Sequence, residues 1–299
     1  MNGIIPLYKP RGMTSADCVY QLRKLLHEKK IGHTGTLDPE VDGVLTICVG
    51  QATKLVNWLL DSDKVYQGQV VLGKATSTED ATGEIIDQKE ILTPFTIEQV
   101  EAAMLSLTGS IQQTPPMYSA VKVNGKRLYE YARAGQIVQR PSRQVTIKKF
   151  QMRGVPHFDE HQHLQMLDFT VVCSKGTYIR TLAVQLGESL NVPAYMSRLT
   201  RTAGSSFTLD QTVSFDQISA KLQQNEFDFC LPLEAAFSSQ IPRCTLTDEQ
   251  WQQVQNGSKI TLAASSKQVL LTFNGIAKAL YQKQADFYVP QIMLLKNDR

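Results

Sequence analysis

The chain has 299 residues, of which 42% are hydrophobic and 20% charged, and its formal net charge is +3. This composition is typical of a globular protein and excludes a disordered or fibrous chain. No run approaches the roughly 18 consecutive apolar residues of a spanning helix, and the N-terminus lacks a signal-peptide pattern. We therefore expect a soluble, cytoplasmic protein without membrane contact. The five cysteines have no CxxC spacing, so we expect reduced thiols.

Charge is distributed unevenly along the chain. From Lys122 to Arg153, nine basic residues stand against one acid, Glu130. From Thr76 to Glu101, seven acids stand against one lysine. Clustered lysines and arginines gain affinity for phosphates by releasing counterions. The basic segment therefore predicts contact with a polyanion, and a merely solvated charged surface is the alternative.

Helices and strands alternate along the first 240 residues, which predicts a mixed α/β fold. We expect a first helix that Ser15 caps and that Gly32 stops, followed by a strand over 44–49, a helix over 52–60 and a strand over 65–72. Thr96 and Gln99 form a capping box, which predicts that a helix begins there and runs to Leu107. A tight turn at Asn124–Gly125, paired strands over 144–152 and 163–173, and a helix over 178–190 follow.

A second unit begins where the pattern changes, around residues 237–242. Beyond this point we expect a helix over 247–255, a hairpin of strands 269–273 and 276–281, and a strand over 288–295. Such short strands predict a small β-barrel-like module. We therefore expect two domains, over 1–240 and 241–299.

The most unusual segment is GHTGTLDPEVDG, from Gly32 to Gly43. It lacks the lysine of a GxxxxGK[ST] phosphate-binding loop, so nucleotide hydrolysis is a poor fit. Its glycines let the backbone approach a ligand closely, and Asp38 is held rigidly beside Pro39. Asp38 is a candidate catalytic carboxylate, with turn capping as the alternative. Asp42 could form with it the carboxylate pair that glycosidic chemistry often uses.

A cluster of histidines mimics metal-ligand spacing. His157, His161 and His163 stand close to Asp159 and Glu160. The cluster lies between two predicted strands, after a glycine and a proline, and no matching ligand set stands elsewhere in the sequence. We favour a polar hairpin turn and expect no metal site.

Several segments together carry a resemblance to a known family. They are LYKPRGMTS (7–15), GHTGTLDPEVDGVLTICVG (32–50), the strand around Tyr66, QTPPMYSAVKVNGKRLYEYAR (113–133) and CSKGTYIRTL (173–182). In this order they resemble the motifs of the TruB-type tRNA pseudouridine-55 synthase family. Val41 and Asp42 stand where that family has a small pair, and Ser77 stands where an acid is usual. We assign neither Asp42 nor Ser77 to the site.

The resemblance implies a fold and an activity. The fold is the pseudouridine synthase fold, with a central mixed, largely antiparallel sheet, an RNA-gripping insertion at 113–143 and a small C-terminal PUA-type RNA-binding domain. The activity is isomerisation of the uridine at position 55 in the T loop of tRNA, after the base is flipped out. No cofactor is implied. We expect the T arm of tRNA as partner, a monomer, and neither guide RNA nor an obligate protein partner.

The resemblance also implies roles for individual residues. The catalytic residues are Asp38, the ion-pair partner Arg180, and Tyr66. The substrate-binding residues, including three from the basic segment, are His33, Tyr178, Lys122, Lys126 and Arg127, and structural support of the site comes from Lys9 and Pro10. A tRNA-binding or RNA-folding protein without chemistry is the alternative, and a glycosidase of carbohydrates is a third interpretation.

Overall fold

A computed structural model of the chain describes residues 1–237 and 240–294. The chain divides into two compact units. Unit 1 comprises Met1–Pro39, Val44–Ser62 and Gly204–Arg299, and unit 2 comprises Glu40–Gly43 and Asp63–Ala203. Among the described residues, none of the helices combines the length and apolar composition that crossing a membrane requires.

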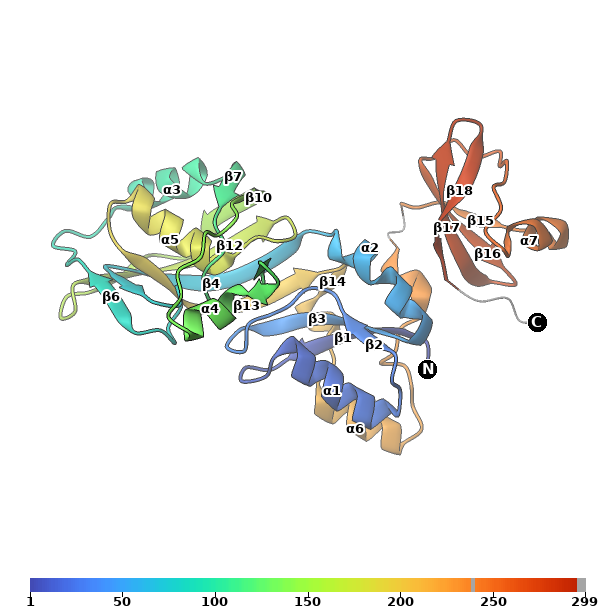
Figure 1. The fold of residues 1–299 in the computed structure, drawn as a ribbon, viewed down its shortest axis with the longest axis horizontal. Helices are drawn as coiled ribbons and strands as arrows, with labels where there is room; N and C mark the ends of the chain where they lie inside the picture. Colours follow the sequence, from blue (N-terminus) through green and yellow to red (C-terminus); the bar gives the residue numbers. More distant parts are fainter. Residues whose placement is uncertain (238–239, 295–299) are drawn as a thin grey trace. The chain divides into compact units, whose positions relative to one another are not determined.

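Unit 1 places two helices against short strands. Its elements before the C-terminal segment are β1 (Gly3–Lys9), α1 (Ser15–Leu26), β2 (Ile31–His33), β3 (Asp42–Val49, whose first two residues belong to unit 2), α2 (Val56–Leu60), β14 (Phe207–Thr208) and α6 (Phe215–Gln223). Helices α1 and α6 lie side by side (Figure 1). A buried apolar cluster joins them to β1 and β3, and includes Leu7, Leu22, Ile47 and Ile218.

The C-terminal part of unit 1 has its own sheet. Four strands in the order β15-β16-β17-β18 form it, with bounds Arg243–Thr245, Gln268–Phe273, Ile276–Gln284 and Phe287–Met293. Helix α7 (Asp248–Val254) precedes β16, and Val254, Val269 and Tyr281 belong to one buried cluster. The short C-terminal strands expected from the sequence are therefore present, and they form a small sheet.

Unit 2 is built on a largely antiparallel sheet. Its strand order is β13-β4-β12-β10-β7, and β11 pairs with β12. The bounds are β4 (Lys64–Leu72), β7 (Gly109–Gln113), β10 (Arg143–Met152), β11 (His157–Asp159), β12 (Leu164–Cys173) and β13 (Ala194–Gly204). The start of β3 joins β13 in parallel. The sheet is mixed and largely antiparallel, as expected.

The remaining elements of unit 2 are helices and two small hairpins. They are β5 (Lys74–Thr76), β6 (Ile85–Gln88), α3 (Ile97–Ser106), β8 (Lys122–Val123), β9 (Lys126–Arg127), α4 (Leu128–Arg133) and α5 (Ile179–Ser189). Helix α3 packs against β10 and α5 (Figure 1). Strands β5 and β6 form one hairpin, and β8 and β9 the other.

Most expected elements are present, and the exceptions have local causes. The first helix is capped by Thr14 rather than Ser15, because the Thr14 hydroxyl oxygen accepts from the Asp17 N–H and the Asp17 carboxylate accepts from the Thr14 N–H. It ends at His27, which is left-handed, and not at Gly32. The helix expected over 52–60 is a 3₁₀ turn (Gly50–Leu55) followed by α2. Leu295, the expected end of the last strand, lies outside the described residues.

Candidate active site

Asp38 lies in the loop between β2 and β3, and its backbone neighbours on both sides are anchored. The Leu37 N–H donates to Ser15 Oγ at 2.9 Å, and the Pro39 carbonyl accepts from Lys9 Nζ at 3.1 Å. Both anchoring side chains are buried, with Lys9 0% and Ser15 1% exposed. The Asp38 side chain is half-buried. A carboxylate on such an anchored loop is held in place before a substrate arrives, which is how catalytic groups avoid an ordering cost.

Lys9 stands at the end of β1 and connects that strand to the loop. Its ammonium donates to the Pro10 carbonyl at 2.9 Å in addition to the Pro39 carbonyl. A buried ammonium requires such acceptors because it has lost its hydration. His33 lies at the other end of the loop, at the end of β2, where it pairs with Ile47 of β3.

Arg180 lies near the start of α5 and is almost fully buried, with 5% of its surface exposed. Its guanidinium donates to the carbonyls of Thr78 and Tyr118, each at 2.9 Å. Its Nε lies 3.8 Å from Asp80 Oδ2. Asp80 is itself fixed, because its Oδ1 accepts from the Thr82 N–H at 3.0 Å. The guanidinium is therefore oriented by two backbone oxygens and by the neighbouring Asp80 carboxylate.

Glu79 lies in the chain between Thr78 and Asp80, two partners of Arg180, and its carboxyl has a raised pKa. Burial raises the pKa of the Glu79 carboxyl, while the hydrogen bond from Thr181 and the charge of Arg180 act in the opposite direction. The Thr181 hydroxyl donates to Glu79 Oε2 at 2.8 Å. Glu79 thus connects the 76–83 loop to the first turn of α5.

Two tyrosines of unit 2 lie on different elements. Tyr66 is in the middle of β4, where it pairs with Val171 of β12 and is 9% exposed. Tyr178 directly precedes α5, and the Cζ of Arg143 lies 4.6 Å from the centroid of its ring. Cation–π contact of this kind favours one orientation of the ring.

Gln113 is a site residue that the sequence interpretation missed. It is 0% exposed, and its amide oxygen accepts from the Tyr178 N–H at 2.9 Å. Its amide nitrogen donates to the Tyr178 carbonyl at 3.2 Å. The available signal was its place as the first residue of the QTPPMYS motif.

The basic hairpin formed by β8 and β9 presents Lys122, Lys126 and Arg127, which are all exposed. Its turn residues, Asn124 and Gly125, have φ of 51° and 84°, and they form the tight turn that the sequence predicted.

Two aromatic rings of α4, those of Tyr129 and Tyr131, lie next to basic side chains of the hairpin. Arg127 and Arg133 lie 5.7 and 5.3 Å from the ring centroid of Tyr129, and Lys126 lies 5.9 Å from that of Tyr131. Cations interleaved with aromatic rings suit a chain of phosphates and bases.

The histidine cluster forms the hairpin turn that the sequence favoured. Strand β11 pairs with β12, and Asp159 Oδ1 accepts from the backbone N–H groups of His161 and Gln162 at 2.9 and 3.0 Å. Within residues 1–237 and 240–294, no group of three or more histidine, cysteine, aspartate or glutamate side chains is placed to hold a metal ion.

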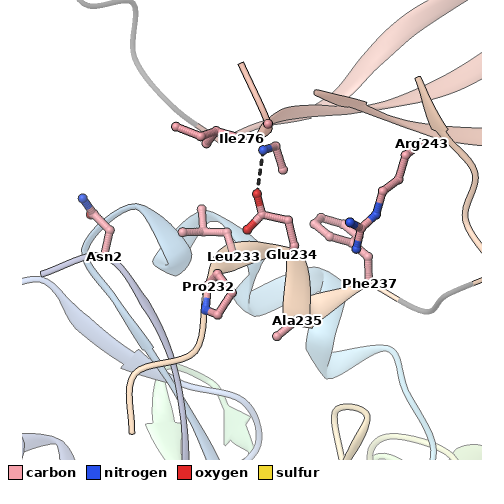
Figure 2. Close-up of a pocket in the computed structure, with 10 residues that line it drawn as sticks. Asn2, Pro232, Leu233, Glu234, Ala235, Phe237, Arg243 and Ile276 are labelled. Atoms are coloured by element: carbon pink, nitrogen blue, oxygen red, sulfur yellow. Dashed lines mark hydrogen bonds between the residues drawn. The ribbon is translucent and has the colours of Figure 1, made fainter. Parts of the chain in front are cut away.

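A cavity of about 830 Å³ lies elsewhere in unit 1 (Figure 2). Phe237 and Ile276 contribute apolar surface to it, and Arg243 contributes a cation. Glu234 also lines it and accepts a hydrogen bond from the Ala277 N–H at 2.6 Å. None of the site residues predicted from the sequence lines this cavity.

The predicted site residues divide between the two units. Unit 1 carries the loop with Asp38, together with Ser15 and Lys9 that anchor it, and unit 2 carries Tyr66, Tyr178, Arg180 and the basic hairpin. Comparison with known proteins adds the family. Residues 23–179 match the model described as TruB family pseudouridylate synthase, N-terminal domain. The chain belongs to the TruB pseudouridylate synthase family.

Relatives in this family are similar along nearly the whole chain. The tRNA pseudouridine synthase B of Lactiplantibacillus plantarum is 52% identical over 294 residues, which are 96% of this chain and 95% of the relative. The tRNA pseudouridine synthase B of Lacticaseibacillus paracasei is 49% identical over 300 residues, which cover 100% of this chain and 99% of the relative. The stretch matched by the family model includes Asp38, Tyr66 and Tyr178, and it ends one residue before Arg180.

Solved structures similar to this chain support the fold. The structure described as a Cbf5-Nop10-Gar1 complex has a TM-score of 0.71 at 23% identity, covering 99% of this chain and 86% of that one. The structure of the archaeal box H/ACA sRNP Nop10-Cbf5 complex has a TM-score of 0.70 at 22% identity, and the match covers 99% of this chain and 87% of that one. The expected fold class is confirmed.

Proposed function

We propose that this chain is a tRNA pseudouridine synthase that converts the uridine at position 55 in the T loop of tRNA to pseudouridine. Family membership and relatives named tRNA pseudouridine synthase B support the proposal. The structural observation that carries it is the anchored loop that holds Asp38 between the Ser15 and Lys9 contacts. A protein that only binds tRNA has no need of a carboxylate held in this way.

The reaction exchanges one bond to the ribose for another. The bond between C1′ and N1 of uracil breaks, the base rotates, and C1′ bonds to C5, which then loses its proton while N1 gains one. No electrons are exchanged with another reactant, so the reaction needs no cofactor. A carboxylate beside the sugar serves it either as a nucleophile or as a stabiliser of the cationic sugar. We assign this role to Asp38.

Arg180 is the proposed ion-pair partner of the Asp38 carboxylate. An ionised aspartate in a dry pocket is costly unless it is paired with a cation. The guanidinium of Arg180 is buried and held by the Thr78 and Tyr118 carbonyls, so its direction is fixed. A preorganised cation of this kind lowers the cost of keeping the carboxylate ionised.

Tyr66 and Tyr178 are proposed to line the uracil pocket. Each ring can stack on the flipped base, and the Tyr66 hydroxyl can take or relay a proton in the acid–base step at C5. Arg143 and Gln113 hold the Tyr178 ring and backbone in one arrangement. A fixed ring stacks without losing side-chain freedom on binding.

RNA binding is proposed to use several surfaces. The basic hairpin within the 113–143 insertion would contact phosphates, and His33 would fill the space that the flipped base leaves in the RNA. Residues 1–240 would form the catalytic domain, and the sheet within 241–299 a PUA-type RNA-binding domain. We expect the enzyme to act as a monomer, in the cytoplasm, without guide RNA.

The decisive experiment uses an unmodified tRNA transcript and the purified protein, in a buffer that contains EDTA and no added cofactor. We expect conversion at position 55, detected by mapping pseudouridine along the RNA. A transcript with cytidine at position 55 is the matched control and should gain no pseudouridine. Binding of tRNA without any conversion would contradict the proposal and favour a tRNA-binding protein.

A further inference from the structure

Asp42 and Thr200 are joined across the parallel pairing of β3 and β13. The Thr200 hydroxyl donates to Asp42 Oδ1 at 2.5 Å, and the two residues are register partners. They are 158 positions apart in the sequence. A hydrogen bond to a charged carboxylate is stronger than one between neutral groups. Asp42 therefore fixes the first residue of β3 to one position on β13.

Gly43 allows the backbone of β3 to lie very close to the backbone of β13. Its φ is 109°, and a Cβ built on it would lie 2.2 Å from the Arg201 carbonyl oxygen and 2.8 Å from the Arg201 nitrogen. A residue with a side chain could not approach β13 in this conformation. The backbone at the start of β3 thus rests directly on the Thr200–Arg201 segment.

The position of Asp42 in the chain gives the contact its importance. Residues Glu40–Gly43 belong to unit 2, whereas the chain on either side of them belongs to unit 1. Asp38 is held between Leu37, which Ser15 anchors, and Pro39, which Lys9 anchors, and both anchoring residues are in unit 1. Four residues downstream of Asp38, the hydrogen bond of Asp42 holds the same loop on β13.

We propose that Asp42 is a positioning residue for the isomerisation, acting through its hydrogen bond with Thr200. By holding the end of the catalytic loop on β13, it sets the position of the Asp38 carboxylate during the reaction. The inference rests on the proposed function. It gives the Asp42 carboxylate a partner on β13 instead of the role of second reacting carboxylate. A displacement of about 1 Å at a reacting group can cost about a hundredfold in rate.

The test measures single-turnover conversion and tRNA affinity in matched variants. Asp42→Ala and Thr200→Val should each slow conversion by about ten- to a hundredfold, with the tRNA Kd within about twofold of wild type. The double variant should be no slower than the slower single variant, because both remove one contact. Asp42→Asn and Thr200→Ser keep an acceptor and a donor, and they should retain most of the rate.

Glu40→Ala is the control. It removes an exposed carboxylate from the same loop and should leave the rate unchanged. A wild-type rate in Asp42→Ala, additive losses in the double variant, or losses confined to tRNA affinity would each overturn the inference. If Asp42→Ala does not fold, the nearly isosteric Thr200→Val decides. An inactive wild-type protein would instead refute the proposed function, so the two failures are distinguishable.

Discussion

Gln113 and Tyr178 are joined by a pair of hydrogen bonds between one side chain and one backbone residue. The Gln113 amide accepts from the Tyr178 N–H at 2.9 Å and donates to the Tyr178 carbonyl at 3.2 Å. Both groups of the Tyr178 backbone are thereby satisfied at the point where α5 begins. A buried glutamine at the end of β7 thus holds the residue that we place beside the uracil.

Gln113→Leu removes both hydrogen bonds. The Tyr178 N–H loses its Gln113 partner, while the Tyr178 carbonyl still accepts from the Leu182 N–H at 3.0 Å. Unsatisfied buried groups cost about 1–3 kcal/mol each, so we expect the free energy of unfolding to fall by at least about 1 kcal/mol. We also expect slower conversion, because Tyr178 is no longer fixed. Urea unfolding and single-turnover assays measure the two effects. Gln112→Ala, at an exposed neighbour, should change neither.

Asp38→Asn should abolish isomerisation while the tRNA Kd remains within about tenfold of wild type. Affinity persists because binding is distributed over many phosphate and base contacts, whereas the reaction depends on one carboxylate. Filter binding and pseudouridine mapping on the same preparation test both parts. Measurable turnover by the pure variant would remove Asp38 from its proposed role.

Tyr66 could serve through its ring or through its hydroxyl, and two substitutions separate these roles. Tyr66→Phe keeps the ring, so tRNA binding should persist while single-turnover conversion falls by about a hundredfold or more. Tyr66→Leu should lose both stacking and proton transfer. If the phenylalanine variant matches wild type while the leucine variant is inactive, the proton is taken by another group.

The basic hairpin predicts a change in salt dependence. Replacing Lys122, Lys126 and Arg127 with alanine should weaken tRNA binding. The slope of log affinity against log salt should become shallower by about 2 to 3 units, since each phosphate contact contributes about 0.7–0.9. The control replaces Lys24, Lys29 and Lys30, three exposed lysines of unit 1. An unchanged slope in the hairpin variant would show that this surface is only solvated.

Glu79 predicts a pH dependence of stability. Burial raises the pKa of its carboxyl, so the folded protein holds the proton to higher pH than the unfolded chain does. The free energy of unfolding should therefore decline as pH rises from the unfolded pKa, about 4.3, through the raised folded value. Glu79→Gln should gain stability relative to wild type over this window. Urea unfolding at several pH values measures the difference, and Glu84→Gln is the exposed control. A difference that stays constant with pH would contradict the assignment.

Local sequence signals predicted local structure well. The Thr96–Gln99 capping box opens α3, and Asn124–Gly125 forms the expected turn. The first helix start was misplaced by one residue because Thr14 and Ser15 are both capping types. The end of that helix was missed because His27 adopts a left-handed conformation without a glycine.

Local sequence signals could not predict the long-range contacts that position the site residues. Gln113 and Tyr178 are 65 positions apart, and Asp42 and Thr200 are 158 apart. Their meeting depends on strand order and register across whole sheets, which local propensity does not determine. Asp38 was identified through its resemblance to a family motif, since a loop aspartate alone is more often a turn cap.

The pairing of β1 has a consequence for synthesis on the ribosome. The Ile4 N–H donates to the Leu231 carbonyl, and the Tyr8 N–H donates to the Val213 carbonyl. At about 5–20 residues per second, roughly ten to fifty seconds separate translation of Ile4 from translation of Leu231. During that interval the apolar strand GIIPLYK has an open edge, which is a hazard for aggregation. Rapid folding of the segments that emerge in between would shorten the time for which this edge stays exposed.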